Sequence, residues 1–218
     1  MKISNISKEN FKAMPIAKAR VNYQGIQTNY DIFSIVKKDY PTMGKIYETI
    51  DLGRIAPKMN EYDRSLWRSI LQVTFNSSIL EKMKTLLLVK DNEPCGTLKY
   101  TDFPNLYFIN GRTTWRKENQ NKLPFAGKVL SLTLFNLLLR ENKNQIKTNI
   151  IRVGGFNNVF KAMELGFSSY GGDELVEDMR ISQSQIKKIL EKFKDVVSID
   201  LIDSAESKDI DLEEVVEI

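Results

Sequence analysis

Residues 128–140 form the segment that most limits how this chain of 218 residues can fold. In a helix they place apolar side chains on most of the circumference, at positions 129, 130, 132, 134, 135, 137, 138 and 139. A helix on the surface of a protein needs only one apolar stripe, so this helix must be covered on several sides. We therefore expect it to lie buried against a β-sheet, in a chain of α/β (α+β) class.

Short apolar and β-branched runs supply the strands of that sheet. Strands are expected at 30–36, 85–89, 95–101, 105–114, 149–153, 167–170 and 174–181, with 196–202 as an edge strand. The linker 90–94 has the length of a hairpin turn, and Gly111 marks a bulge. Helices are expected at 39–52, at 62–75, at 157–165 before Gly166, and from a cap at Ser184 onward.

The same pattern divides the chain into four parts. We expect an irregular or β-containing extension over 1–29, one domain over 30–182, a helix and edge strand over 183–202, and an acidic tail over 203–218. The tail carries a net charge of −6, which leaves +10 on the rest. This surplus suits an anionic partner such as a phosphorylated cofactor, nucleic acid or the tail itself, and solvated lysines explain it equally well.

The chain has no histidine and a single cysteine, Cys95. These counts exclude a Ser-His-Asp triad, a Cys-His dyad, His-ligated zinc and an internal disulfide, and we expect no metal. Proton transfer would fall to carboxylates, tyrosine, lysine or water. The longest unbroken apolar run is 86–89, and residues 1–20 lack the apolar segment of a secretory signal. We therefore expect a cytoplasmic protein with no membrane span.

Three motifs between residues 30 and 181 together resemble the GNAT-type N-acetyltransferase superfamily. Residues 157–167 resemble its Asn-containing helix that closes on Leu-Gly-Phe, Gly96 stands where the family commonly has a hairpin glycine, and residues 127–130 are similar to the end of its acyl-CoA loop, Gln/Arg-x-x-Gly-x-Gly/Ala. The resemblance implies a central mixed, mostly antiparallel sheet flanked by helices, to which this chain adds a C-terminal helix and an acidic tail. It also implies acetyl-CoA or another acyl-CoA as co-substrate and a primary amine as acceptor.

The acyl-CoA loop has a physical rationale of its own. A tight turn that opens a helix exposes unpaired backbone N–H groups and the positive end of the helix dipole, which together bind a pyrophosphate. The expected cofactor-binding residues of this loop are Lys122, Phe125, Ala126, Gly127, Lys128 and Val129. The resemblance adds Asn157 or Asn158 as a partner of the pantetheine amide, and a plain helix N-cap explains either asparagine equally well.

The loop departs from the family pattern at one position that matters. When Gly127 is aligned with the last glycine of the pattern, Lys122 takes the Gln/Arg position and Phe125 takes the first glycine. Either the Phe125 ring fills the phosphate site, or it packs on the buried helix at Leu130 and Leu134. We expect the second arrangement, in which the loop still binds the cofactor.

The catalytic candidates are residues whose type suits acyl transfer to an amine. The tyrosine that often serves the family as general acid has no counterpart, because its position falls near Ala162. Tyr107 and Tyr170 are candidate donors to the leaving thiolate, and either could instead be a core aromatic; Tyr170 is preferred because it closes the strand after Leu-Gly-Phe. Asp102, Glu118 and Glu164 are candidate bases, and each is more readily explained as a solvated surface acid.

Three functions stay open on this basis. The first is an acyl-CoA-dependent N-acyltransferase with an unidentified amine acceptor. The second is a non-catalytic GNAT-like module that binds a ligand or a protein, which Phe125 and the missing tyrosine favour. The third is nucleic-acid binding, which we do not expect because no helix is dense in Arg and Lys and no aromatic–basic strand motif occurs. Acyl chain length and oligomeric state, a homodimer included, also stay open.

Overall fold

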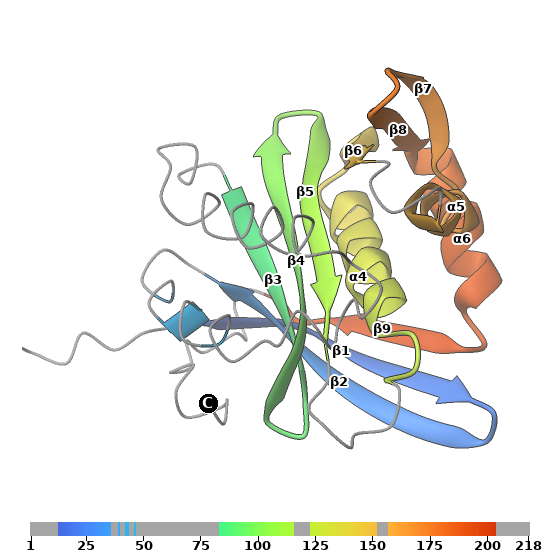
Figure 1. The fold of residues 1–218 in the computed structure, drawn as a ribbon. Coiled ribbons are helices and arrows are strands. Elements are labelled where there is room, and N and C mark those ends of the chain that lie inside the picture. Colours follow the sequence, from blue (N-terminus) through green and yellow to red (C-terminus); the bar gives the residue numbers. More distant parts are fainter. Residues whose placement is uncertain are drawn as a thin grey trace, which may run out of the picture.

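The computed structural model describes residues 13–35, 83–115, 123–151 and 157–203, together with Asp39, Thr42, Met43 and Ile46. These ranges contain a nine-stranded sheet in the order β7-β8-β6-β5-β4-β3-β2-β1-β9 (Figure 1). Neighbouring strands are antiparallel except for β5 and β6, which are parallel. The strands are β1 (Met14–Tyr23), β2 (Ile26–Ile35), β3 (Met83–Lys90), β4 (Glu93–Phe103), β5 (Leu106–Thr114), β6 (Gln145–Ile151), β7 (Ser168–Gly172), β8 (Val176–Ser182) and β9 (Val197–Leu201).

The helices labelled in Figure 1 are α4 (Ala126–Arg140), α5 (Asn157–Glu164) and α6 (Gln183–Phe193). A mixed, mostly antiparallel sheet flanked by helices confirms the predicted fold class. Within the described ranges, no helix is both long and apolar enough to cross a membrane. The helices expected at 39–52 and 62–75 fall outside the described residues except for four positions, and so does the tail after Asp203.

Two expected boundaries were wrong. Strand β6 begins at Gln145 rather than at 149. Ile146 and Thr148 are buried and Lys147 between them is less buried, which is the alternation of a strand. Helix α6 is capped by Ser182 rather than by Ser184. The Ser182 hydroxyl accepts from the backbone N–H of Gln185, whose side chain accepts in turn from the Ser182 N–H, and this reciprocal pair forms a capping box.

The two ends of the described chain meet at one edge of the sheet. The segment expected as an extension contains β1 and the start of β2, so the expected boundary between residues 29 and 30 lies inside a strand. Strand β9 pairs with β1 from Ala17↔Leu201 to Val21↔Val197, which confirms the predicted edge strand. The backbone N–H of Asn22 also donates to the carbonyl of Val196 at 2.8 Å. The β1–β2 hairpin is therefore held in place by the C-terminal part of the sheet.

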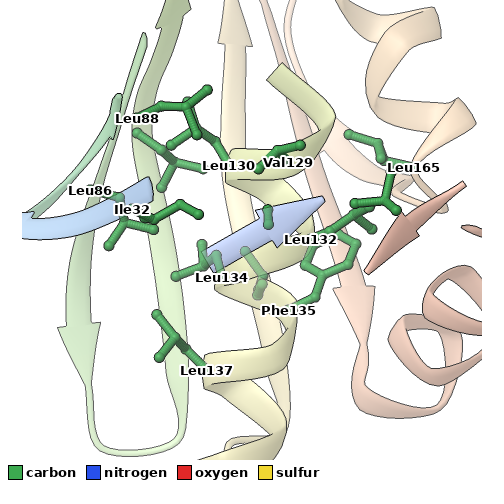
Figure 2. Close-up of a cluster of buried hydrophobic side chains, with 14 of the residues drawn as sticks. Ile32, Leu86, Leu88, Val129, Leu130, Leu132, Leu134, Phe135, Leu137 and Leu165 are labelled. Atoms are coloured by element: carbon green, nitrogen blue, oxygen red, sulfur yellow. The ribbon is translucent and has the colours of Figure 1, made fainter. Parts of the chain in front are cut away.

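Helix α4 is buried on several sides, as its apolar circumference predicts (Figure 2). In the close-up, Ile32, Leu86 and Leu88 of the sheet face Leu130 and Leu134 of the helix. Other sides of α4 contact β9 and α6. Complete burial of each leucine stabilises the fold by about 1.5–3 kcal/mol relative to exposure. Because several leucines are buried at once, these contacts hold α4 on the sheet.

The opposite face of the sheet carries a second apolar cluster. Successive residues of β3 alternate between the two faces, so Leu86 and Leu88 join the α4 cluster whereas Leu87 and Val89 pack with Met43 and others of the second cluster. A strand that is covered on both faces needs a continuous apolar run instead of alternation. This double burial explains why residues 86–89 hold the longest apolar run of the chain.

Strands β5 and β6 pair only over their first residues, from Leu106↔Gln145 to Ile109↔Thr148. Beyond that point β5 stays paired with β4, and β6 stays paired with β8. A bulge at Asn110 interrupts the β4–β5 register beside Gly111, which confirms the predicted bulge. The two parallel strands therefore end their pairing halfway, and the last residues of β5 continue along the start of α4.

An ion-pair cluster fixes the other end of α4. Lys143, which follows the helix, is nine-tenths buried at its side chain and lies 2.7 Å from Asp102 at the end of β4. Its Nζ also donates to the carbonyl of Phe103 at 2.8 Å, and Asp102 accepts from Lys84 at 2.6 Å. Burial alone raises the pKa of Asp102, but the hydrogen bonds and charges of Lys143 and Lys84 outweigh it and hold that pKa below its ordinary value.

This cluster predicts a pH-dependent contribution of Asp102 to stability. A carboxylate whose pKa is lowered by folding stabilises the fold above its unfolded-state pKa, and the stabilisation disappears as the pH falls through the folded-state pKa. We expect Asp102→Asn to lower the free energy of unfolding by about 1–2 kcal/mol at pH 7, because the buried Lys143 loses its counter-charge. Urea denaturation at pH 7 and at pH 3 measures the effect.

At pH 3 the wild type and Asp102→Asn should differ much less than at pH 7. The exposed Asp200 on β9 supplies the matched control, and Asp200→Asn should change stability by less than about 0.5 kcal/mol at either pH. If Asp102→Asn lowered the free energy of unfolding by the same amount at both pH values, the carboxylate charge would not contribute to stability.

Candidate acyl-CoA site

The first turn of α4 leaves backbone N–H groups outside the helical hydrogen-bond pattern. The first backbone bond of the helix runs from the N–H of Val129 to the carbonyl of Phe125 at 2.8 Å, so the N–H groups of Ala126, Gly127 and Lys128 precede it. Phe125 is the N-cap and makes no side-chain cap bond, and the first turn holds no acidic residue. This helix end can therefore receive an anion.

A hydrogen bond from a neighbouring strand fixes the loop before α4. The hydroxyl of Tyr30 on β2 donates to the carbonyl of Pro124 at 2.9 Å. Tyr30 is almost completely buried, and burial raises the pKa of its hydroxyl, so the group stays a neutral donor. The path of the loop is therefore set by the sheet below it.

Arg112 brings a positive charge to the same turn from β5. Its Nη1 donates to the Ser131 hydroxyl at 2.6 Å and to the carbonyl of Gly127 at 3.1 Å. Burial lowers the pKa of Arg112, yet a guanidinium stays protonated at any physiological pH. Among the described residues Arg112 has no carboxylate partner, so its charge is available to an anion at the helix start.

The helix start opens into a cleft of about 1160 Å³. Arg112 and Thr114 of β5 line one wall, and a second wall comes from α5. The turns β1–β2 and β3–β4 close the remaining sides. The α5 residues that line the cleft are Asn158, Lys161, Glu164 and, just after the helix, Leu165. Because pockets for drug-sized ligands hold about 300–1,000 Å³, a long ligand with several parts suits this cleft.

The charges around the cleft are only partly balanced. Lys128 lies 3.8 Å from Glu164, and Lys90 pairs with Asp91. Lys161, like Arg112, has no carboxylate partner within the described part of the chain. Two uncompensated cations therefore face the space beside the helix start, which favours an anionic ligand.

Phe125 adopts a left-handed backbone conformation, with φ 59° and ψ 9°. Glycine tolerates this region without strain, whereas a residue with a Cβ does not. The ring packs edge-on against Tyr23, with ring centroids 5.0 Å apart, and against Phe193 at 6.3 Å. It also packs against the buried cluster to which Leu130 and Leu134 belong, the side chains on which it was expected to lie. The contacts with Tyr23 and Phe193 were not expected.

Gly127 does not need a glycine for backbone reasons. Its φ is not positive, and an added Cβ would lie 3.7 Å from Nε of Arg112 and 3.8 Å from Cγ2 of Thr114, which are ordinary contacts. The chain itself therefore tolerates a Cβ at residue 127. The value of glycine at this position would be the closer approach that it allows to a ligand at the helix start.

The structure brings most of the described loop candidates together. Phe125, Ala126, Gly127, Lys128 and Asn158 all line the cleft. Val129 does not: it is completely buried, and its N–H already donates to Phe125. Lys122 and Glu118 fall outside the described residues, as does the side chain of Asn157.

Two catalytic candidates lie away from the cleft. Asp102 belongs to the ion-pair cluster at the far end of α4, about 22 Å along the helix from its start. Tyr170 is 41% exposed on β7, where Lys147 and Arg180 lie over its ring at 5.2 and 5.4 Å. Glu164 does line the cleft, where it faces Lys128.

The Cys95 thiol also borders the cleft but is unsuited to nucleophilic attack. The side chain is buried, and its S–H donates to the carbonyl of Leu88 at 3.4 Å. Burial raises the pKa of the thiol to about 12, so the thiolate is scarce at neutral pH.

Sequence reasoning missed several residues of this site, among them Tyr23, Arg112 and Lys161. Tyr23 lies in the segment that was assigned to an extension, and Lys161 carried no motif signal. Arg112 had one usable signal, since a bulge beside Gly111 re-aims the side chains that follow it. In the described residues, no three His, Cys, Asp or Glu side chains gather as a metal site would require.

No protein-family model matches the chain, and no curated protein matches it. Similar solved structures do exist. The PaiA N-acetyltransferase from Thermoplasma acidophilum in complex with coenzyme A has 13% identity and a TM-score of 0.54, with 70% of this chain and 98% of that chain covered.

Two further structures share the fold over a longer stretch. Apo FdhC, a nucleotide-linked sugar GNAT, has 12% identity and a TM-score of 0.51 over 85% of this chain and 96% of its own. An uncharacterized protein from Bacillus halodurans has 12% identity and a TM-score of 0.53 over 85% and 98%. The chain has the fold of the GNAT N-acetyltransferases, which confirms the resemblance seen in the sequence.

Proposed function

We propose that the chain binds an acyl-CoA in the cleft at the start of α4 and transfers its acyl group, acetyl in the first instance, to a primary amine. The observation that carries the proposal is the helix start itself. Backbone N–H groups outside the helical pattern and the Arg112 charge meet in one cleft, and β5, which no longer pairs with β6 beyond Ile109, reaches this cleft at Arg112 and Thr114. A GNAT-fold enzyme whose structure holds coenzyme A supports the choice of ligand.

The pyrophosphate would lie at the first turn of α4. The N–H groups of Gly127 and Lys128 would donate to its oxygens, and Arg112 would balance its charge from β5. The pantetheine arm would follow the edge of β5 beyond Ile109, where β6 no longer pairs. Asn158 on α5 faces the same cleft and would bond a pantetheine amide.

In the reaction, the amine nitrogen attacks the thioester carbonyl, the C–N bond forms, and the C–S bond breaks. The ammonium proton must pass to a base, and the leaving thiolate must take up a proton. The role of the described residues is to hold the thioester in place, which lowers the entropic barrier to attack. Base and acid must be carboxylate, tyrosine, lysine or water, since the chain has no histidine.

One observation favours a second function, acyl-CoA binding without turnover. Ala162 occupies the neighbourhood of the family's tyrosine and is buried, while Asp102 and Tyr170 lie away from the cleft. Binding and turnover separate the two functions. Release of free CoA thiol from acetyl-CoA in the presence of a panel of primary amines supports transfer, whereas binding with no amine-dependent release supports the binding module.

A variant of Gly127 tests the position of the pyrophosphate. Acetyl-CoA should raise the melting temperature of the wild type, because a ligand that binds only the native state stabilises it by mass action. Gly127→Ala should weaken acetyl-CoA binding at least about tenfold, since the added methyl group occupies the path of the phosphate to the backbone. Isothermal titration calorimetry measures the affinity, and thermal denaturation without ligand checks the fold.

Gly171→Ala on β7 is the matched control, because its Cβ would meet only the Asp178 side chain at 3.4 Å and the position lies outside the cleft. The control should bind acetyl-CoA like the wild type. Equal binding by Gly127→Ala would refute the position of the pyrophosphate. A wild type that is stabilised by neither acetyl-CoA, longer acyl-CoAs nor CoA would refute the proposed function itself.

Two variants of Phe125 test its backbone conformation. Phe125→Ala and Phe125→Gly both remove the ring contacts with Tyr23 and Phe193, but only glycine relieves the left-handed conformation. We therefore expect the glycine variant to be the more stable of the two by about 1 kcal/mol, the reverse of the usual order inside a helix. Urea denaturation of both variants measures the difference.

Affinity tests whether the ring obstructs the site. Because the ring packs on Tyr23 and Phe193, neither variant should bind acetyl-CoA more tightly than the wild type. A glycine variant that binds more tightly would show a blocked natural site and would favour the non-catalytic function. An alanine variant as stable as the glycine variant would mean that residue 125 is not left-handed in solution.

A further inference from the structure

We infer that the β1–β2 turn binds the nucleotide end of the acyl-CoA and makes the protein selective for the intact coenzyme over shorter acyl carriers. The inference rests on the proposed function. It concerns the part of the ligand beyond the pyrophosphate, which in coenzyme A is an adenine base on a ribose 3′-phosphate. The residues of the turn that line the cleft are Tyr23, Gln24, Ile26 and Gln27.

Two large apolar side chains of the turn are exposed. Tyr23 is 43% exposed and Ile26 is 65% exposed, and both border the cleft. They form the last residue pair of the hairpin, so they project side by side from its end. An exposed aromatic ring beside an aliphatic side chain offers a flat apolar surface on which a purine can stack.

The turn is rigid enough to act as a preformed surface. Its two central residues, Gln24 and Gly25, have φ angles of 51° and 77°, which is the geometry of a tight hairpin turn with two left-handed residues. The N–H of Asn22 bonds the carbonyl of Val196, and β1 pairs with β9. A surface that is ordered before binding loses little conformational entropy when the ligand arrives.

The turn also lies on the correct side of the proposed pyrophosphate. Arg112 and Thr114 flank the helix start on the Gly127 side, where β5 supplies the pantetheine edge. Tyr23 contacts the ring of Phe125, which is the residue immediately before the helix. A ligand that runs from β5 across the helix start therefore reaches Tyr23 after its phosphates.

A cation is placed for the ribose phosphate. Nζ of Lys128 lies 5.0 Å from the centre of the Phe125 ring, which contacts Tyr23 of the turn, and 5.2 Å from that of Phe193. Its carboxylate neighbour, Glu164, is 3.8 Å away and largely exposed, so the pair is weak enough to open. The amides of Gln24 and Gln27 add donors and acceptors for the base edge.

The experiment compares two probes, acetyl-CoA and S-acetyl-4′-phosphopantetheine, which lacks the adenosine, its 3′-phosphate and one phosphate of the pyrophosphate. Isothermal titration calorimetry on the full chain should show that the wild type binds acetyl-CoA at least about 30-fold more tightly. The variants are Tyr23→Ser and Ile26→Ser. Each should weaken acetyl-CoA binding about fivefold to tenfold and leave the affinity for S-acetyl-4′-phosphopantetheine unchanged.

Leu175→Ser on the β7–β8 connection is the matched control, because Leu175 is 69% exposed and lies outside the cleft. It should change neither affinity. Ile26→Ser keeps the test valid if loss of the Tyr23 ring disturbs Phe125, since Ile26 has no ring contact to lose.

Three results would overturn the inference while leaving the proposed function intact. They are equal affinity of the wild type for the two probes, an equal loss for both probes in Ile26→Ser, and no loss for either probe in Ile26→Ser. The last result would assign the exposed turn to contact with another protein. A wild type that binds neither probe refutes the proposed function instead.

Discussion

The burial of α4 determines where this protein can have a site. Apolar side chains on most of its circumference hold the helix between the sheet, whose edge strand β9 it contacts, and α6. Its C-terminal end is fixed by Lys143 and Asp102, and its N-terminal end by Arg112 and Tyr30. Because the helix is held at both ends, its first N–H groups keep one position in the fold. At that position they border the cleft.

The sequence predicted the elements whose signals are local. The apolar run of β3, the helix start near Gly127 and the glycine after α5 need only their immediate neighbours to be recognised. At Gly166 the φ is +82°, as a helix-ending glycine requires. Strand β1 gave a weaker signal because its buried residues include Ala17 and Ala19, which have low strand propensity. They are buried only because β2, β9 and α4 surround them, and a single sequence does not contain that information.

The same difference between local and long-range signals applies to the candidate site. Residues of one loop stay together in any fold, so the sequence was enough to group Phe125 to Lys128, which line one cleft. Asp102 and Arg112 lie on adjacent antiparallel strands, and the sequence does not show which end of the β4–β5 pair faces the helix start. Asp102 pairs with Tyr107 near the turn, five residues before Arg112 on β5, or about 17 Å. Strand register, not residue type, therefore makes Arg112 the cation of the cleft and Asp102 part of the ion-pair cluster.

Phe125 shows how the two ends of the described chain act together. A left-handed conformation costs a non-glycine residue about 1–2 kcal/mol, and each aromatic pair contributes about 0.5–1.5 kcal/mol beyond its burial. The two rings that contact Phe125 come from the two ends of the described chain, Tyr23 from the β1–β2 hairpin and Phe193 from α6. These contacts are of the size needed to offset the strain at residue 125. Without the hairpin and α6, glycine would be the favoured residue there, so Phe125, the hairpin and α6 form one compensated unit.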